Sequence, residues 1–266
     1  MIRLVALDLD GTLLSSRDQV SEANARAVQR AREGGVVVVL CTSRWYGIAR
    51  GTAEALGLRA PLICHNGALV RSPDSAPDLV YLPLDPSAAR EVTAFIDQHP
   101  STAFLTVGET TYIRPRHAVE PGSVPPGLVV VERLLDVVGE PAMGFLVFGE
   151  AASDEVEAAF GRSHGHLLNI ERGYSAVFPH YVNIVHAGAD KGHALLAVCR
   201  HLGVDPADAL AVGDAGPDIS MFRFAGHSVA MANAPDYVKS AAEAVGPSND
   251  EDGVAWAIER FVLGEG

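Results

Sequence analysis

The sequence predicts an α/β protein whose parallel sheet is interrupted by an inserted α+β module. In the first and last parts of the chain, short apolar runs of strand length alternate with amphipathic segments of helix length. This alternation stops near residue 83 and resumes near residue 189, and hairpin-like strand pairs fill the interval. Strand–helix–strand units connect with right-handed crossovers and produce a parallel sheet. We therefore expect a Rossmann-like core from residues 1–82 and 185–266, and a separate domain over residues 83–184.

The first part of the core begins with an apolar run at residues 5–9, which is typical of a strand buried on both faces. Ser21 is a suitable N-cap for the helix that follows, and the glycine pair at 34–35 ends this helix. The other elements expected here are a strand over 36–40, a helix over 48–56, a strand over 62–64, and a hairpin of 69–71 with 79–82.

The inserted segment has a different pattern. Asp85 and Pro86 start a helix, a hairpin forms around residues 108–109, and the Pro/Gly-rich stretch 116–127 is expected to be a loop. Further elements expected in it are strands over 143–148, 166–171, 176–178 and 182–185, and a helix over 154–160. In the last part of the core we expect helices over 191–202, 236–242 and 254–263, strands over 208–212 and 228–231, and a short helix from Pro217.

Two carboxylates stand at the end of the first strand. Asp8 and Asp10 are two residues apart, a spacing that places both side chains on the same side of a strand. Buried carboxylates are costly unless a cation or a reaction needs them, and the apolar neighbours argue against an acidic surface turn. One such carboxylate can attack a phosphoryl group while the other transfers protons beside a hard cation.

Other polar residues follow at the carboxyl ends of later strands, where open α/β sheets bind ligands. Thr42 and Ser43 follow the second strand and can donate hydroxyl hydrogen bonds to a phosphate, although ordinary strand-end capping explains them equally well. Lys191 opens a helix, where a cation opposes the helix dipole but is well placed to hold an anion. Asp214 follows an apolar strand, and Asp218 lies four residues further on, where it can also cap a helix.

Composition excludes several classes of function. The net charge of −13 argues against nucleic acid as a partner, because phosphate backbones require a basic face. No run approaches the ~18 apolar residues of a membrane helix, and the first strand leaves no room for a signal peptide. The three cysteines suggest neither a disulfide framework nor a zinc site, so we expect a cytoplasmic protein. The histidines do not form a metal-binding pattern, and we single out only His180 for contact with a substrate.

The polar residues also match a known family in order. DxDGT at residues 8–12, the threonine at 42, the lysine at 191 and Gly-Asp-x-x-x-Asp at 213–218 resemble the four motifs of the haloacid dehalogenase (HAD) superfamily. Matches at residues 65–68, 190–192, 229–234 and 250–254 resemble its Cof-type branch, and the inserted segment is similar to the cap domain of that branch.

This resemblance implies a phosphatase that depends on magnesium (Mg2+) and works through an aspartyl-phosphate. Asp8 would be the nucleophile and a magnesium ligand. Asp10 would be the general acid/base, and its backbone carbonyl would also bind magnesium. Asp214 would be a further magnesium ligand, and Asp218 would support the metal shell or the lysine.

The resemblance also implies a phosphate-binding set. Thr42 and Lys191 would hold the phosphoryl oxygens with help from Ser43, and Asn66 would face the site at the hinge to the cap. Two positions depart from the pattern, because Ser43 stands where glycine is usual and Pro217 stands where asparagine is usual.

The sequence is compatible with three functions. The first is a phosphatase for a small phosphorylated metabolite such as a sugar phosphate, acting as a monomer or homodimer without nucleic-acid or membrane partners. The second is a phosphomutase of the same superfamily. The third is a phosphate-binding or signalling module, either a catalytically weakened member or a receiver-like domain. A receiver is disfavoured by the second carboxylate at Asp10 and by the long insertion.

Overall fold

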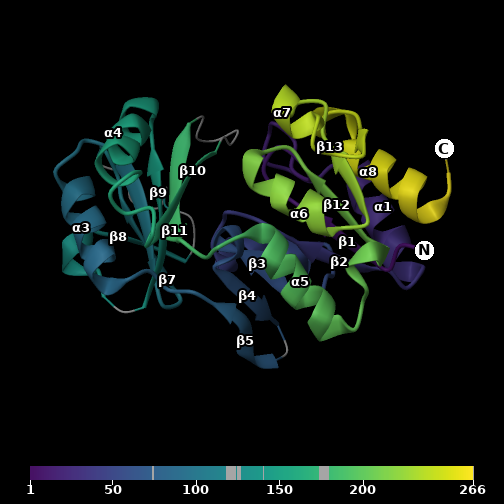
Figure 1. The fold of residues 1–266 in the computed structure, drawn as a ribbon, viewed down its shortest axis with the longest axis horizontal. Coiled ribbons are helices and arrows are strands. Elements are labelled where there is room, and N and C mark those ends of the chain that lie inside the picture. The colour runs from purple at the N-terminus through teal and green to yellow at the C-terminus, as the bar shows by residue number, and fades with distance from the viewer. Residues whose placement is uncertain (74, 118–123, 125–126, 140, 174–179, 266) are drawn as a thin grey trace. The chain divides into compact units, whose positions relative to one another are not determined.

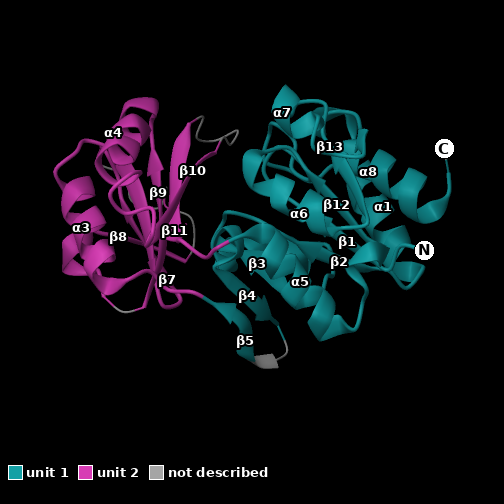
Figure 2. Cartoon of the chain, in the orientation of Figure 1, with its two compact units in different colours: residues 1–81, 175–177, 190–266 teal, residues 82–174, 178–189 magenta. Residues whose placement is uncertain are grey.

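The computed structural model describes residues 1–73, 75–117, 124, 127–139, 141–173 and 180–265. This part of the chain divides into two compact units (Figure 2), one formed by residues 1–81 and 190–266 and the other by residues 82–173 and 180–189. The strand expected over 176–178 and most of the loop expected over 116–127 lie outside the described residues. None of the described helices has the length and apolarity needed to cross a lipid bilayer.

The first unit is built on a parallel sheet with the strand order β14-β13-β12-β1-β2 (Figure 1). The first strand, β1, pairs in parallel with neighbours on both sides, Leu4 with Ala209 of β12 and with Val37 of β2. The expected α/β class and parallel core are therefore confirmed. The strands of this sheet are β1 (Leu4–Leu7), β2 (Val37–Leu40), β12 (Ala209–Gly213), β13 (His227–Ala230) and β14 (Ala244–Val245).

Helices cover this sheet. One cluster of buried residues joins alternate positions of the strands, such as Leu4 and Ala6, to Leu195 of α5 and Met221 of α6. On β1 the intervening residues are also fully buried, so the strand is covered on both faces. The helices α1 and α8 contact each other, and Asn24 of α1 accepts a hydrogen bond from the backbone of α8. The helices of the unit are α1 (Glu22–Glu33), α2 (Tyr46–Ala55), α5 (Lys191–Leu202), α6 (Ile219–Phe224), α7 (Asp236–Lys239) and α8 (Gly253–Ile258).

One region of the first unit differs from a simple alternation of strand and helix. β3 (Leu62–Cys64) does not extend the parallel sheet but begins a three-stranded antiparallel sheet with β4 (Leu69–Ser72) and β5 (Ser75–Tyr81). A single bridge between Cys41 and Ile63 connects it to the end of β2. All three residues of β3 pair with the first strand of the hairpin that follows, from Leu62 with Arg71 to Cys64 with Leu69.

The second unit is a six-stranded sheet with the order β10-β11-β9-β6-β7-β8 and two helices. Val92 of α3 and Val156 of α4 belong to one buried cluster with Leu105, Phe145 and Ile184 of the sheet, so both helices pack on one face. Its elements are α3 (Pro86–Asp97), β6 (Thr102–Val107), β7 (Thr110–Arg114), β8 (Leu128–Val130), β9 (Ala142–Phe148), α4 (Glu150–Phe160), β10 (Leu168–Gly173) and β11 (Tyr181–His186).

Candidate active site

The first acidic residue lies where β1 ends. Asp8 still donates its backbone N–H to the carbonyl of Val212 on β12, at 3.1 Å, so the sheet fixes its position. Its carboxylate is buried, with 5% of the residue exposed. The chain then turns at Gly11, whose φ of +77° favours glycine, and a Cβ there would lie 2.3 Å from the carboxylate of Asp214. Gly11 therefore allows the end of β1 to approach the end of β12.

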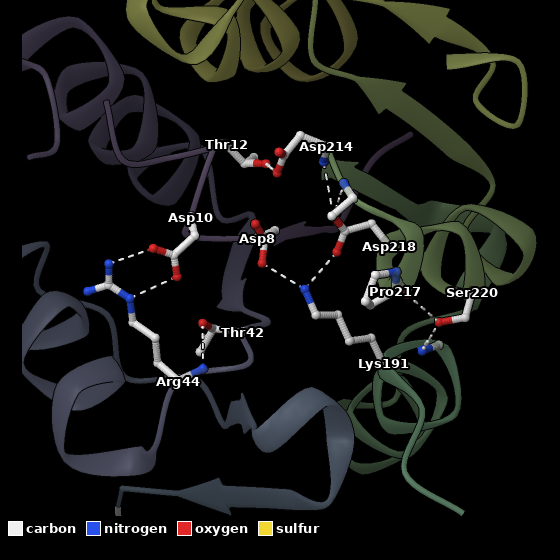
Figure 3. A network of polar contacts seen from close by, with 12 residues as sticks. Asp8, Asp10, Thr12, Thr42, Arg44, Lys191, Asp214, Pro217, Asp218 and Ser220 are labelled. Atoms are coloured by element: carbon white, nitrogen blue, oxygen red, sulfur yellow. Dashed lines mark hydrogen bonds and ion pairs between the residues drawn. The ribbon is translucent and has the colours of Figure 1, made fainter. Parts of the chain in front are cut away.

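Lys191 links two carboxylates in the interior (Figure 3). Its Nζ donates to Oδ1 of Asp8 and to Oδ1 of Asp218, each at 2.7 Å. All three side chains are at least nine-tenths buried. Lys191 is the first residue of α5, where Asp190 caps the helix by accepting from the backbone of His193. The cost of a cation at a helix start is offset by two charge-assisted hydrogen bonds.

Asp218 holds the end of β12 as well as the lysine. Its Oδ2 accepts from the backbone N–H groups of Asp214 and Ala215, at 3.0 and 2.9 Å. Both of its oxygens are thus engaged. Asp214 itself is fixed by Thr12, whose hydroxyl donates to Oδ1 of Asp214 at 2.9 Å. The threonine of the first motif therefore orients the aspartate of the fourth.

Three carboxylates share one ammonium in this cluster, and the pKa values of Asp8 and Asp214 reflect it. Burial raises the pKa of Asp8 well above its ordinary value, and the charges of Asp218 and Asp214 add to this effect. Burial and the charge of Asp218 also raise the pKa of Asp214 to about 7. Burial by itself would lower the pKa of Lys191, but Asp218 and Asp8 outweigh this and raise it. The cluster is short of positive charge.

The same carboxylates have the chemistry of a site for a hard cation. One oxygen from each of Asp8, Asp214 and Asp218 lies within 4.8 Å of the others. Oxygen ligands of this kind suit magnesium or a similar ion. Because both oxygens of Asp218 already accept hydrogen bonds, Asp8 and Asp214 are the better side-chain ligands. Among the described residues, Oδ2 of Asp8 accepts no hydrogen bond.

Asp10 does not join this cluster through its side chain. Its carboxylate is paired with Arg44, which donates from Nε to Oδ2 at 2.9 Å and from Nη2 to Oδ1 at 2.6 Å (Figure 3). Sequence reasoning missed Arg44. The available signal was its position two residues after Thr42, at the same sheet edge as the acidic pair.

The phosphate-binding residues expected from the sequence lie on the loop after β2. Thr42 is fully buried, and its hydroxyl accepts from the backbone of Arg44 at 3.0 Å, whereas Ser43 is half-buried. The carbonyl of Thr42 accepts from the backbone of Asn66, which is buried in a left-handed turn. Gly67 continues this turn at φ +95°, and a Cβ there would lie 2.4 Å from a backbone oxygen of Asp190. The turn around Asn66 therefore contacts both Thr42 of the second motif and Asp190, which precedes the lysine of the third motif.

Two positions singled out from the sequence remain. Pro217 is linked to the site by hydrogen bonds, and His180 lies in the second unit. Pro217 is the second residue of a short helical turn (Gly216–Asp218), and its carbonyl accepts from Ser220, whose hydroxyl in turn accepts from the backbone of Gly192 at 3.0 Å. This chain connects the fourth motif to the helix that carries Lys191. His180 belongs to the second unit, where its carbonyl accepts from Gly149. Its contact with a substrate stays a prediction.

A parallel α/β core with a lysine bridging two buried aspartates at its carboxyl edge, and with a second unit inserted into it, defines a class of hydrolases. The family model described as haloacid dehalogenase-like hydrolase matches residues 5–258, and the chain belongs to this family. Its enzymatic class is that of the HAD phosphatases. The resemblance found in the motifs is thereby confirmed.

Individual relatives agree with this assignment. The chain is 31% identical over 262 residues to 5-amino-6-(5-phospho-D-ribitylamino)uracil phosphatase YcsE of Bacillus subtilis, covering 98% of this chain and 96% of that protein. It is 29% identical to a chloroplastic endoribonuclease YBEY of Arabidopsis thaliana, but it spans only 46% of the length of that protein. A HAD subclass IIB sugar phosphatase has the same fold, with a TM-score of 0.78 at 20% identity over 97% of this chain and 98% of that one.

Proposed function

We propose that this chain is a magnesium-dependent phosphatase that hydrolyses a small phosphorylated metabolite through an aspartyl-phosphate on Asp8. The observation that carries the proposal is the position of the Lys191 ammonium. It lies 2.7 Å from the carboxylate of Asp8, at the end of β1, and 2.7 Å from the carboxylate of Asp218. A carboxylate held in this way is oriented for attack and is accompanied by a cation that can stabilise a phosphoryl oxygen.

In the first step an oxygen of Asp8 attacks phosphorus, and the bond from phosphorus to the leaving oxygen breaks. Asp10 protonates that leaving oxygen. In the second step Asp10 takes a proton from water, the water oxygen attacks phosphorus, and the bond to Asp8 breaks. Lys191 and the hydroxyl of Thr42 hold phosphoryl oxygens in both steps, with Ser43 as a further donor.

A divalent cation would be held by the carboxylates of Asp8 and Asp214 and by the backbone carbonyl of Asp10, with Asp218 orienting Lys191 and the backbone around Asp214. When bound, it would neutralise charge on the phosphoryl group and on the nucleophile. The deficit of positive charge in the cluster supports this role, and the oxygen donors support magnesium as the ion.

The substrate class rests on the relatives. One of them is named as a phosphatase of a phosphorylated ribitylamino-uracil, and a protein of the same fold is named as a sugar phosphatase. We therefore infer a phosphate ester of a sugar, a polyol or a similar small metabolite. We assign the choice among such esters to the inserted domain, residues 83–184 of the sequence-based division.

The test is release of inorganic phosphate by the purified protein with magnesium across a panel of phosphorylated metabolites. We expect hydrolysis of at least one sugar or polyol phosphate, and no phosphate release by the Asp8→Asn variant. Conversion of one phosphate ester to an isomer without phosphate release would indicate a mutase and overturn the proposal. Absence of any turnover would indicate a phosphate-binding member.

A further inference from the structure

Arg44 binds two carboxylates at once. Besides its two hydrogen bonds to Asp10, its Nη2 atom also donates to Oδ1 of Asp18. Arg44 and Asp10 are largely buried, with 18% and 11% of their side chains exposed, whereas 38% of the Asp18 side chain is exposed. Burial would lower the pKa of the Arg44 guanidinium, but the bonds to the two carboxylates raise it. Arg44 is therefore a permanent cation shared by Asp10 and Asp18.

The backbone fixes Arg44 from both sides. Its N–H donates to the hydroxyl of Thr42 at 3.0 Å, and its carbonyl accepts from the backbone of His65 at 3.1 Å. A guanidinium is a planar fork that fits both oxygens of a carboxylate, so it sets the plane of the carboxylate as well as its distance. The rotation of the Asp10 carboxylate is therefore restricted by an arginine whose own backbone is held by hydrogen bonds.

Asp18 is presented to Arg44 by a tight turn. Its backbone is left-handed, with φ +58°, and its N–H donates to the carbonyl of Ser15 at 2.9 Å. The backbone of Ser15 in turn donates to the carbonyl of Gln19 at 2.9 Å. The neighbouring N–H of Ser16 donates to the side chain of Asp250 at 2.8 Å, which attaches the turn to the rest of the unit. The position of Asp18 is thus built into the fold.

We propose that Arg44, held in place by Asp18, is a positioning residue for Asp10, and that Asp18 influences proton transfer without touching the substrate. The inference rests on the proposed function, in which Asp10 transfers protons. Asp10 has both oxygens held by Nε and Nη2 of Arg44, and Asp18 accepts a second hydrogen bond from the same Nη2. Loss of Asp18 leaves Asp10 as the one carboxylate bound to Arg44, so the guanidinium and the Asp10 carboxylate are restrained less.

Leaving groups of different basicity provide the test. Phenyl phosphate releases a more basic phenolate than p-nitrophenyl phosphate, so it depends more on a proton from Asp10, while the two esters have nearly the same shape. General acid catalysis contributes roughly 10²–10⁴-fold, so we expect Arg44→Ala to lower kcat for phenyl phosphate about tenfold more than for p-nitrophenyl phosphate. We expect Asp18→Asn to shift the same ratio about threefold, with little change in KM.

The variants separate this role from a structural one. Asparagine adopts positive φ readily, so Asp18→Asn removes the charge and keeps the turn, and it carries the test if Arg44→Ala fails to fold. Because Asp18 acts through Arg44, the double variant Asp18→Asn/Arg44→Ala should match Arg44→Ala alone. Arg44→Lys keeps the charge but not the fork and should not restore the ratio.

A matched control exists in the same unit. Asp78 accepts a similar arginine fork from Arg71, at 2.7 and 2.9 Å, with comparable exposure. Asp78→Asn should leave the ratio of the two esters unchanged. Equal losses of kcat on both esters in Asp18→Asn, or losses that multiply in the double variant, would overturn the inference. Neither result would contradict the proposed function. A wild-type protein that releases no phosphate from any ester contradicts the proposed function instead, and the inference falls with it.

Discussion

Replacing Asp214 by asparagine should make the metal-free protein more stable at neutral pH. Asp214 shares its surroundings with Asp8 and Asp218, and in the absence of a cation its ionisation adds a third negative charge beside one ammonium. Asparagine has the same shape, and its carbonyl can still accept the hydrogen bond from Thr12. The variant therefore removes the charge and keeps the packing.

The pKa of Asp214 sets the size and the sign of the effect. It is raised from 3.8 to about 7 in the folded protein by burial and by the charge of Asp218. The folded state therefore holds a proton that the unfolded chain releases, and the stability from this group is full below pH 3.8 and is lost as the pH rises to about 7. One pH unit corresponds to about 1.4 kcal/mol, and because Asp214 is partly exposed we expect a loss of roughly 2–4 kcal/mol. Asparagine does not titrate and avoids this loss.

Urea unfolding in chelator between pH 4 and pH 8 measures the difference directly. The free energy of unfolding of Asp214→Asn, minus that of the wild type, should rise through this range and then level off. His65, whose pKa burial lowers to about 4, changes stability in the opposite direction, but it is present in both proteins and cancels. Asp236→Asn, at a fully exposed aspartate, should show no such rise.

Magnesium should offset most of this difference in stability. A cation that binds only the folded state adds about 2.7 kcal/mol at a hundredfold excess over its dissociation constant. The wild type should gain this at pH 8 and Asp214→Asn much less. A pH-independent difference in chelator would refute the shared-charge explanation of the cluster.

Three further predictions follow from the site. Asp8→Asn should abolish phosphate release without lowering the melting temperature, because it removes the nucleophile and one buried charge together; activity near that of wild type would contradict the role of Asp8. Chelation should eliminate activity and magnesium should restore it, as measured by phosphate release. Pro217→Asn should raise kcat/KM roughly tenfold, because it restores one hydrogen-bond donor, and the gain should be larger with Ser43→Gly if Ser43 compensates for the proline. A double-mutant cycle on these two positions checks this, and additive effects would exclude compensation.

Much of the core could be predicted because its pattern is local. The apolar run before Asp8 and the β-branched run at 36–40 became β1 and β2, each buried and paired in parallel. β3 was expected at the correct residues, but its antiparallel partners were not. Strand pairing depends on which segment lies nearest after the chain turns, and the left-handed residues His65 and Asn66, which make that turn, carry no apolar signal.

The acidic site was predictable in composition but not in pairing. The sequence placed Asp8 and Asp214 at one edge of the sheet, and the family resemblance added Asp218. The structure has one oxygen of each within 4.8 Å of the others. The sequence did not indicate that the side chain of Asp10 turns to Arg44, because β1 ends at Leu7 and the alternation of side chains along a strand no longer holds at Asp10. These partners are far apart in the chain and are brought together by the sheet.

The residues that violate local preferences are those that assemble the site. Lys191 is unfavourable at a helix start, yet it lies between two buried carboxylates. Gly11 gives up a side chain where strand β1 ends, and no other residue would let that turn approach Asp214 without a clash. Such conflicts between local preference and global fold are expected at functional sites. In this chain they occur where β1, β12 and α5 meet, so the cost in local stability is concentrated at the cluster that holds the proposed nucleophile.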